Sequence, residues 1–357
     1  MKIIHTSDIH LDAAMQSGLT PEQARIRRSE LMSAFSRLVE YAKSAGASAV
    51  IVAGDLFDSG EITAKVRRFV IDTVASEVNI QFFILFGNHD AGSFSFSDKL
   101  PENMHLFSSE WQSFDLLEAT VSGVELTGEN CESIYSELVL DENKTNIVVM
   151  HGAAGNASCE DKINVKLLAN RGIDYLALGH YHSYEQKKLD RRGVYAYSGC
   201  LEGRGFDEAG EKGFVELTLE NGKIKAEFVP FAARQIHIVE ADLSGTVSYT
   251  EQKAKILEAT DNIESSAMLR VVANGALPDT AEKFFSQIEK ELKDKFFVFE
   301  IKDKTKIAID VSEYEGDISL KGEFIRLVTS KADLSDDDKD KIIRMGLAAL
   351  MGERDEI

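Results

Sequence analysis

Short apolar runs alternate with amphipathic stretches at the start of the chain. Residues 2–6, 49–53 and 81–86 are apolar runs of strand length, and residues 21–45 carry apolar positions at helical spacing. A second helix is expected over about residues 63–76. The order predicts β-α-β-α-β, and the unbroken run at 81–86 predicts a central strand that is buried on both faces.

Shorter strands are expected in the middle of the chain. Their predicted positions are residues 104–107, 114–119, 121–126, 146–150 and 175–178. A turn at Ser122-Gly123 would join two of them and continue a second sheet. Asn221-Gly222 is a strong turn signal, and it predicts a hairpin over residues 214–231.

The pattern changes after Arg234. Strands are expected over residues 235–241, 267–273 and 306–311, with helices near 249–259 and 280–294. After Ser319, two short helices with apolar faces flank an acidic stretch, which suits either docking of a partner or packing against the protein itself. The predicted domains are residues 1–232, an α+β cap at 233–312 and a helical tail at 313–357.

Composition narrows the class of protein. The chain has 357 residues and 44% hydrophobic content, enough for a large core and a smaller second unit. Its three cysteines form no close pair, and it has neither a leader pattern nor an apolar run of 18 residues, so we expect a cytoplasmic protein without a membrane segment. A formal net charge of −20 disfavours a broad basic DNA-binding face, so any grip on nucleic acid would be local.

Polar side chains follow five of the predicted strands. Because ligands bind at the carboxyl edge of an open α/β sheet, these residues are expected to form one site. Asp8 could instead cap a helix, and the Gly-Asn-His-Asp run could be an ordinary turn. Recurrence favours the site, since five of the eight histidines lie just past strand ends. The five motifs are Asp8-x-His10, Gly54-Asp55, Gly87-Asn88-His89-Asp90, His151-Gly152 and Gly179-His180-x-His182.

This donor set indicates a metal centre. Carboxylates, imidazoles and an amide oxygen suit manganese, iron or zinc better than calcium, and the absence of cysteine argues against a structural zinc site. Two such ions about 3.5–4 Å apart, bridged by a hydroxide, are a common device for in-line attack on phosphorus. The sequence therefore predicts two divalent ions, with Mn²⁺ favoured and iron or zinc as alternatives.

The five motifs, in this order, resemble the calcineurin-like metallophosphoesterase superfamily over about residues 1–230. The resemblance implies an α/β sandwich of two sheets flanked by helices, with a smaller C-terminal α+β cap. It also implies that Asp8, His10 and His182 hold one ion, that Asn88, His151 and His180 hold the other, and that Asp55 bridges them. His89 would contact the substrate phosphate or protonate the leaving oxygen, and Asp90 would fix its ring.

Within this superfamily the chain is most similar to the SbcD-type DNA repair nucleases. The similarity lies in the opening HTSDIHLD (5–12), in the stretch YSGCLEGRGFDEAGEKGF (197–214) and in the layout of the C-terminal part. It implies a DNA exonuclease or endonuclease in double-strand-break repair, an SMC-like coiled-coil ATPase as partner, and a homodimer as an assembly to test. The stretch 197–214 is expected to be a loop lining the cleft, with Arg204 as a phosphate contact, a cation next to the metal site or a structural salt bridge.

Two other functions remain open at this point. The same metal centre would serve a small-molecule phosphodiesterase or phosphatase. A non-catalytic regulatory subunit of an SMC-like ATPase is a different class, and the intact ligand set argues against it. The nuclease hypothesis requires basic residues to face one cleft, and the candidates are Arg25, Arg27, Arg28, Arg67, Arg68 and Arg204.

Overall fold

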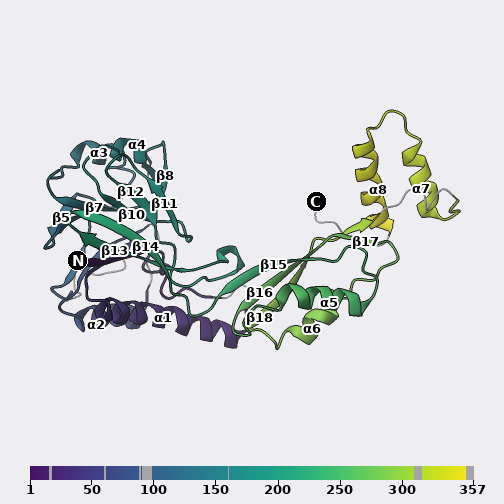
Figure 1. Cartoon of the computed structure of the whole chain (residues 1–357), viewed down its shortest axis with the longest axis horizontal. Coiled ribbons are helices and arrows are strands. Elements are labelled where there is room, and N and C mark those ends of the chain that lie inside the picture. Colours follow the sequence, from purple (N-terminus) through teal and green to yellow (C-terminus); the bar gives the residue numbers. More distant parts are fainter. Residues whose placement is uncertain are drawn as a thin grey trace. The chain divides into compact units, whose positions relative to one another are not determined.

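The computed structural model describes residues 1–15, 18–59, 62–87, 90, 99–159, 161–308 and 316–350. The chain divides into two compact units, Met1–Ile236 and His237–Ile357 (Figure 1). The second unit holds both the predicted cap and the predicted tail, and a boundary between those two stays a prediction. Among the described residues, no helix combines the length and the apolar character needed to cross a membrane.

The first unit contains two six-stranded sheets. The first sheet has the order β14-β13-β1-β2-β3-β4, and the second has the order β11-β12-β10-β7-β6-β5. Strands β1 to β4 are parallel to one another, as are β6, β7, β10 and β12. The bounds in the first sheet are β1 Lys2–Thr6, β2 Ala47–Ala53, β3 Gln81–Leu85, β4 Met104–Leu106, β13 Gly213–Glu220 and β14 Lys223–Pro230. Those in the second are β5 Gln112–Asp115, β6 Ala119–Gly123, β7 Thr145–His151, β10 Tyr175–Gly179, β11 Glu185–Lys188 and β12 Val194–Tyr197.

Alternating side chains of the central strands build two separate cores. Ile3 and Ile51 point to one face and pack with Val149 of the second sheet. Ile4 and Val50, their chain neighbours, point to the other face and pack against helices. The sheets are therefore buried on both sides, and the α/β sandwich of two sheets flanked by helices is confirmed.

Two helices cover the outer face of the first sheet. Helix α1, Pro21–Ser44, is capped at its N-terminus by Thr20, whose side chain forms a reciprocal capping box with Gln23. Helix α2, Ala64–Ala75, begins at Thr63, whose hydroxyl accepts a hydrogen bond from a backbone amide. Their apolar stripes join the core formed by the outer face of this sheet. The short helices α3, Ile134–Glu137, and α4, Val165–Leu168, contribute to the core on the outer face of the second sheet.

Two sequence predictions about strands are wrong. Strand β3 is buried as expected, but it lies between β2 and β4, one position from the edge, and is not central. Ser122-Gly123 lies inside β6 and makes no turn, and the chain turns instead where Leu116 N–H donates to Ala119 O at 2.7 Å. Gly123 has a packing role, since a Cβ there would come within 2.7 Å of the Phe107 ring.

The stretch 197–214 is a loop between β12 and β13, as predicted, and its Asp207 and Glu208 line a cavity together with His182. Most of residues 196–203 are buried, and so are Glu208 and Lys212. Glu202, 1% exposed, accepts a hydrogen bond from Arg37 at 2.7 Å and lies 3.7 Å from the guanidinium of Arg27. Ion pairs therefore allow this polar segment to pass through the interior.

The second unit is an α+β structure. Strand β15, Ile236–Asp242, begins at the boundary and pairs in a three-stranded sheet, in the order β15-β16-β18, that packs with two helices around one apolar core. Residues 309–311 of the predicted strand 306–311 lie outside the described part, and the sequence missed β18. The remaining bounds are α5 Tyr249–Thr260, β16 Met268–Asn274, β17 Ala276–Pro278, α6 Phe285–Leu292, β18 Val298–Asp303 and β19 Lys306–Ala308.

Two helices form the end of the described chain. Helix α7, Leu320–Thr329, and helix α8, Asp336–Leu350, pack against each other and against Ile307 of β19 through Ile325, Val328, Ile343 and Leu347. Other apolar side chains of this segment are exposed, among them Ile318, Leu320, Leu327 and Met345. The inner face packs on the protein's own unit while these side chains remain accessible.

Candidate metal centre

The candidate site lies where five parallel strands of the two sheets end. Asp8 and His10 follow β1, Asp55 follows β2, His151 ends β7, and His180 follows β10. His182 comes two residues later, and Asn88 and His89, which follow β3, lie outside the described residues. Carboxyl ends of neighbouring parallel strands meet at the same edge of each sheet, and the face-to-face packing of the two sheets brings the two sets of strand ends together.

Strained backbone presents several of these side chains. Asp8, His10 and Asp55 have φ angles of 50°, 50° and 51°, in a region that L-residues rarely occupy. Asp8 N–H donates to the carbonyl of Gly54 at 3.0 Å, and His10 N–H donates to that of Asp55 at the same distance. These bonds couple the two strand ends, and such conformations persist where the surroundings determine them, often at functional sites.

Asp8, His10 and His182 form the first group of candidate metal ligands. They offer ligand atoms that all lie within 4.8 Å of one another. His10 Nε2 and His182 Nε2 are 3.3 Å apart, and His182 Nε2 lies 3.7 Å from Asp8 Oδ1. Three donors from the ends of two different sheets therefore face one point.

Asp8, Asp55 and His151 form a second group under the same distance limit. His151 Nε2 lies 3.4 Å from Asp55 Oδ2. His151 Nδ1 lies 2.9 Å from the carbonyl oxygen of Ala53, and since a carbonyl only accepts, Nδ1 carries the proton. Nε2 is then a lone-pair donor that is buried and has no hydrogen-bond partner among the described residues.

Three glycines leave the room that these ligands need. A Cβ at Gly54 would lie 2.1 Å from His151 Nδ1, and one at Gly87 would lie 2.1 Å from Asp55 Oδ1. A Cβ at Gly179 would lie 1.9 Å from the carbonyl oxygen of Ala53. Gly54 and Gly87 are thus required by close approach to candidate ligand side chains, and Gly179 by close approach to the backbone of Ala53.

The electrostatics of the site call for cations. Asp8 and Asp55, 1% and 3% exposed, are two carboxylates in one buried cluster. Burial raises the pKa of Asp8, and the neighbouring charge of Asp55 adds to this effect. Burial of like charges is costly unless cations compensate it, and ring nitrogens of His10, His151 and His182 lie within 4.8 Å of at least one of these carboxylates. The residues therefore fit a pair of divalent ions.

The pKa values of His182 and His180 are shifted in opposite directions. A hydrogen bond with Glu208 raises the pKa of His182, because the carboxylate stabilises the protonated ring. Burial lowers the pKa of His180, whose ring lies 5.6 Å from that of His151 between centroids. His180 belongs to neither ligand group, although its backbone N–H donates to both carboxylate oxygens of Asp8 at 3.1 Å. Its assignment as a ligand stays a prediction.

Asp90 has contacts that the sequence did not suggest. Its carboxylate accepts hydrogen bonds from the backbone amides of Leu56 at 3.1 Å, Phe57 at 2.7 Å and Gly87 at 3.0 Å. Burial nevertheless raises the pKa of Asp90 to about 6. Asp90 therefore ties the loop after β2 to the loop after β3. Its predicted contact with His89 stays a prediction, as does the catalytic role of His89.

Two of the six candidate arginines, Arg27 and Arg204, are held in ion pairs within the protein. Arg27 is fully buried beside Glu30 and Glu202 and donates to the carbonyl of Gly203 at 2.6 Å, so it cannot face a cleft. Arg204 donates to Asp58 and Glu208. The requirement for six arginines in one cleft is therefore wrong for Arg27.

Glu208 is a residue that sequence reasoning missed. Its Oε1 lies 2.7 Å from His182 Nδ1 and accepts from Arg204 Nη2 at 2.8 Å. Although burial alone would raise the pKa of Glu208, hydrogen bonds from His182 and Arg204 hold it well below its usual range. The only sequence signal was its place in the polar stretch 197–214.

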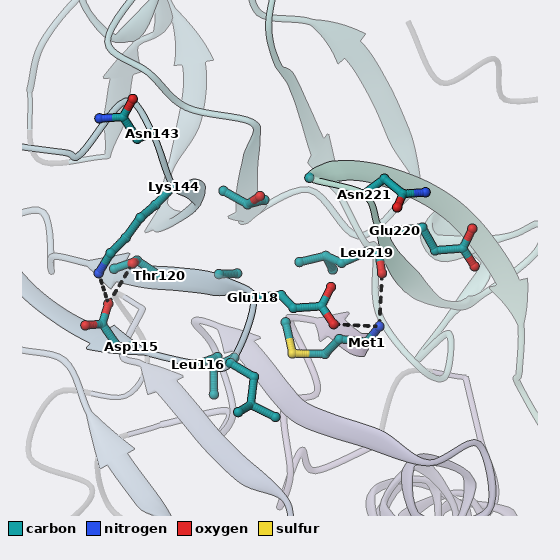
Figure 2. Close-up of a pocket in the computed structure, with 14 residues that line it drawn as sticks. Met1, Asp115, Leu116, Glu118, Thr120, Asn143, Lys144, Leu219, Glu220 and Asn221 are labelled. Atoms are coloured by element: carbon teal, nitrogen blue, oxygen red, sulfur yellow. Dashed lines mark hydrogen bonds and ion pairs between the residues drawn. The ribbon is translucent and has the colours of Figure 1, made fainter.

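A cavity of about 610 Å³ opens beside the ligand histidines and includes the exposed rings of Tyr181 and Tyr184. A second cavity of about 780 Å³ lies elsewhere, at the starts of β1, β6 and β7 (Figure 2). There Lys144 donates to Asp115 at 2.8 Å, and the amino group of Met1 donates to Leu219 O at 2.9 Å. This second cavity contains none of the predicted ligands and lies at the amino edge of the parallel strands. The first cavity, which includes His180 and His182, is the one that adjoins the candidate site.

Fold and site together define a metal-dependent hydrolase. The model of the calcineurin-like phosphoesterase family matches residues 1–184, and the chain belongs to this family. The fold of this family binds a dinuclear metal site, and the two groups of donors described above supply candidate ligands for it. The two groups overlap at Asp8, whereas the resemblance implied Asp55 as the bridge.

Three curated relatives extend the comparison. An uncharacterized metallophosphoesterase of Bacillus subtilis, YhaO, is 24% identical over 335 residues, which cover 85% of this chain and 81% of the relative. The DNA double-strand break repair protein Mre11 of Methanosarcina acetivorans is 26% identical over 308 residues, covering 83% of this chain and 49% of the relative. The D subunit of the nuclease SbcCD of Escherichia coli is 34% identical over 95 residues, covering 26% of this chain and 22% of the relative. The resemblance to SbcD- and Mre11-type proteins is confirmed.

Proposed function

We propose that this protein is a metal-dependent nuclease that hydrolyses phosphodiester bonds of DNA in double-strand-break repair. The carrying observation is the pair of ligand groups, Asp8 with His10 and His182, and Asp8 with Asp55 and His151, at the strand ends of the two sheets. The names of the Mre11 and SbcCD relatives support DNA as the substrate. For a protein with this role we propose a cytoplasmic location.

The residues of the chain have separate tasks in the proposed reaction. Asp8, His10, His182, Asp55 and His151 would hold the ions, together with Asn88 and His180. A bound pair of divalent ions neutralises phosphate charge and makes water a nucleophile at neutral pH. His89 would donate a proton to the leaving oxygen, and Asp90 would keep the loop that carries His89 against the loop after β2 through its bonds to Leu56 and Phe57.

Manganese is the proposed metal. Neutral imidazoles with carboxylates form a donor set of intermediate hardness, which suits Mn²⁺ and also accommodates iron or zinc. The described ligand groups contain no cysteine, which is consistent with this choice. The protein is expected to regain activity with Mn²⁺ after chelation.

The surroundings of the centre favour a substrate that carries bases. Tyr181 and Tyr184 are 45% and 37% exposed in the cavity next to His180 and His182. Every nucleobase has a face that stacks on an aromatic ring, and such stacking tolerates any sequence. A simple phosphate monoester would make no use of these rings.

The ATPase partner is proposed to bind the last two helices. Leu320 is 69% exposed, Leu327 58% and Met345 51%, so α7 and α8 present accessible apolar side chains although their inner faces are packed. A coiled coil would cover such side chains by helix-to-helix packing. Formation of a homodimer stays a prediction.

The nuclease proposal makes a prediction about salt. With a net charge of −20 and with Arg27 buried, few phosphates can be neutralised, so free duplex DNA should bind weakly. Each phosphate contact contributes a slope of about −0.9 to log K against log salt, so the slope should correspond to only a few contacts. The measurement is Mn²⁺-dependent digestion of end-labelled duplex DNA over a salt series, beside hydrolysis of a small phosphodiester.

Addition of the ATPase supplies the control. It should raise both DNA affinity and salt slope and leave hydrolysis of the small ester nearly unchanged. Rapid turnover of a nucleotide-sized ester, with no DNA cleavage even when the ATPase is present, would replace the nuclease by a small-molecule phosphodiesterase. No hydrolysis of either substrate would point to the non-catalytic subunit.

A further inference from the structure

Arg204 lies at the centre of a network that reaches two of the ligand histidines. Its Nη1 donates to Asp58 Oδ1 at 2.8 Å, and its Nε and Nη2 donate to Glu208 Oε1 at 3.0 and 2.8 Å. Its backbone N–H donates to the other oxygen of Glu208 at 2.7 Å. The guanidinium thus joins two carboxylates from distant parts of the chain.

Each of these carboxylates faces the Nδ1 atom of one ligand histidine. Glu208 Oε1 accepts a hydrogen bond from His182 Nδ1 at 2.7 Å, and Arg204 Nη2 itself lies 3.4 Å from the same nitrogen. Asp58 Oδ1 lies 3.3 Å from His10 Nδ1, which is an ion-pair distance. A carboxylate beside Nδ1 favours the tautomer with the proton on that atom, so that Nε2 keeps its lone pair. The two Nε2 atoms are the ones that lie 3.3 Å apart in the first ligand group.

The histidines that this network links belong to different sheets. His10 follows β1 of the first sheet, and His182 follows β10 of the second. A ligand pair assembled from two sheets depends on whatever fixes the two ring planes relative to each other. The Arg204 side chain is 25% exposed and that of Glu208 is 4% exposed, so their charge-assisted bonds are partly shielded from water.

We propose that Arg204 is a positioning residue, which fixes the rings and tautomers of His10 and His182 through Asp58 and Glu208 and does not contact the substrate phosphate. The inference rests on the proposed metal centre. Arginine suits the task because its planar guanidinium carries five donors and can join two carboxylates at once, whereas the ammonium of lysine is a point charge. Without Arg204, Asp58 and Glu208 would lose the cation between them. Both carboxylates would then become more mobile and would hold the rings of His10 and His182 in less defined orientations.

The test compares Arg204→Ala and Arg204→Lys with the control Arg192→Ala. Arg192 forms a similar bidentate pair with Asp174, which precedes β10 and so lies at the opposite end of that strand from His180. Three quantities are measured: the dissociation constants for Mn²⁺, the ¹⁵N shifts of the histidine rings in metal-free protein, and the KM and kcat for a small phosphodiester at saturating metal.

Loss of Arg204 should weaken metal binding by roughly 10- to 100-fold, the usual effect of removing a group that orients a metal ligand. The ¹⁵N shifts of two histidine rings should move toward a mixture of tautomers, while KM at saturating metal stays within about twofold. Guanidinium ion, at concentrations far below those that unfold the protein, should partly restore metal affinity in Arg204→Ala. Arg192→Ala should show none of these changes.

A raised KM with unchanged metal affinity and unchanged ring shifts would overturn the proposal and make Arg204 a substrate contact. If Arg204→Ala does not fold, the same measurements on Arg204→Lys test the proposal. Lysine keeps the positive charge but lacks the planar guanidinium that can bond both carboxylates at once. Failure of the proposed function is recognised separately, since a wild-type protein that binds two ions but cleaves no DNA still reports metal affinity and ring shifts.

Discussion

Asp55→Asn is expected to lose most of its bound metal and to reduce hydrolysis by roughly 10³-fold. Metal stabilisation of the transition state is worth several kcal/mol, and about 1.4 kcal/mol corresponds to a factor of ten in rate. The Oδ2 of Asp55 lies 3.4 Å from His151 Nε2 and 3.9 Å from His10 Nε2, so this atom adjoins donors of both ligand groups. Asparagine keeps the shape of the side chain and removes its charge. Elemental analysis and initial rates on the same preparation measure the two effects.

Asp115→Asn is the matched control for this change. Asp115 is an exposed carboxylate that pairs with Lys144 at 2.8 Å, in the cavity shown in Figure 2. This variant should retain full metal content and wild-type rates. If Asp55→Asn instead binds two ions as firmly as the wild type, Asp55 does not bridge them.

His89→Ala is expected to keep both metal ions and to lower turnover by roughly 10²- to 10⁴-fold, the usual contribution of a general acid. His89 lies outside the described residues, so its role rests on the Gly87-Asn88-His89-Asp90 motif and on the family. The described neighbour Asp90 is held by three backbone amides, which fixes where this loop leaves β3. Metal content and kcat measured on one sample separate the two effects.

His105→Ala is a suitable control because His105 has a packing role. It hydrogen-bonds Gln81 at 2.8 Å and stacks on Phe83 at 5.1 Å between ring centroids. Its loss should lower thermal stability and leave kcat per folded molecule unchanged. Loss of metal from His89→Ala would show that His89 is a ligand and not an acid.

Local pattern was enough to predict much of the first unit. The apolar runs and helical spacing predicted β1, β2, β3, α1 and α2, since strands that are buried on both faces must be apolar throughout. Asn221-Gly222 predicted the hairpin because both residues adopt positive φ angles, 52° and 71°. Each of these patterns lies within a short stretch of sequence, so it can be recognised without knowledge of the fold.

The errors arose where distant contacts decide the structure. Gly123 looked like a turn residue, but it is small because the Phe107 ring lies against it. The loop at 197–214 was predicted, but the burial of its Glu202 beside Arg27 and Arg37 of helix α1 was not. A sequence does not show which charges will meet in the fold.

For the candidate site, too, local motifs predicted the main residues but not their long-range contacts. Parallel strand ends meet at one edge, so the motifs alone implied that Asp8, His10, Asp55, His151 and His182 would come together. The link from Arg204 to Asp58 spans 146 residues of sequence, and no spacing rule connects them. The candidate ligands and Arg204 were therefore visible in the sequence, whereas the contacts of Arg204 with Asp58 and Glu208 were not.

Elemental analysis of protein that has been stripped with a chelator, reloaded with Mn²⁺ and freed of excess metal tests the central claim most directly. The two ligand groups that share Asp8 predict two manganese ions per chain and recovery of phosphodiesterase activity in proportion to occupancy. A content of one ion per chain or fewer in fully active protein would contradict the paired metal centre.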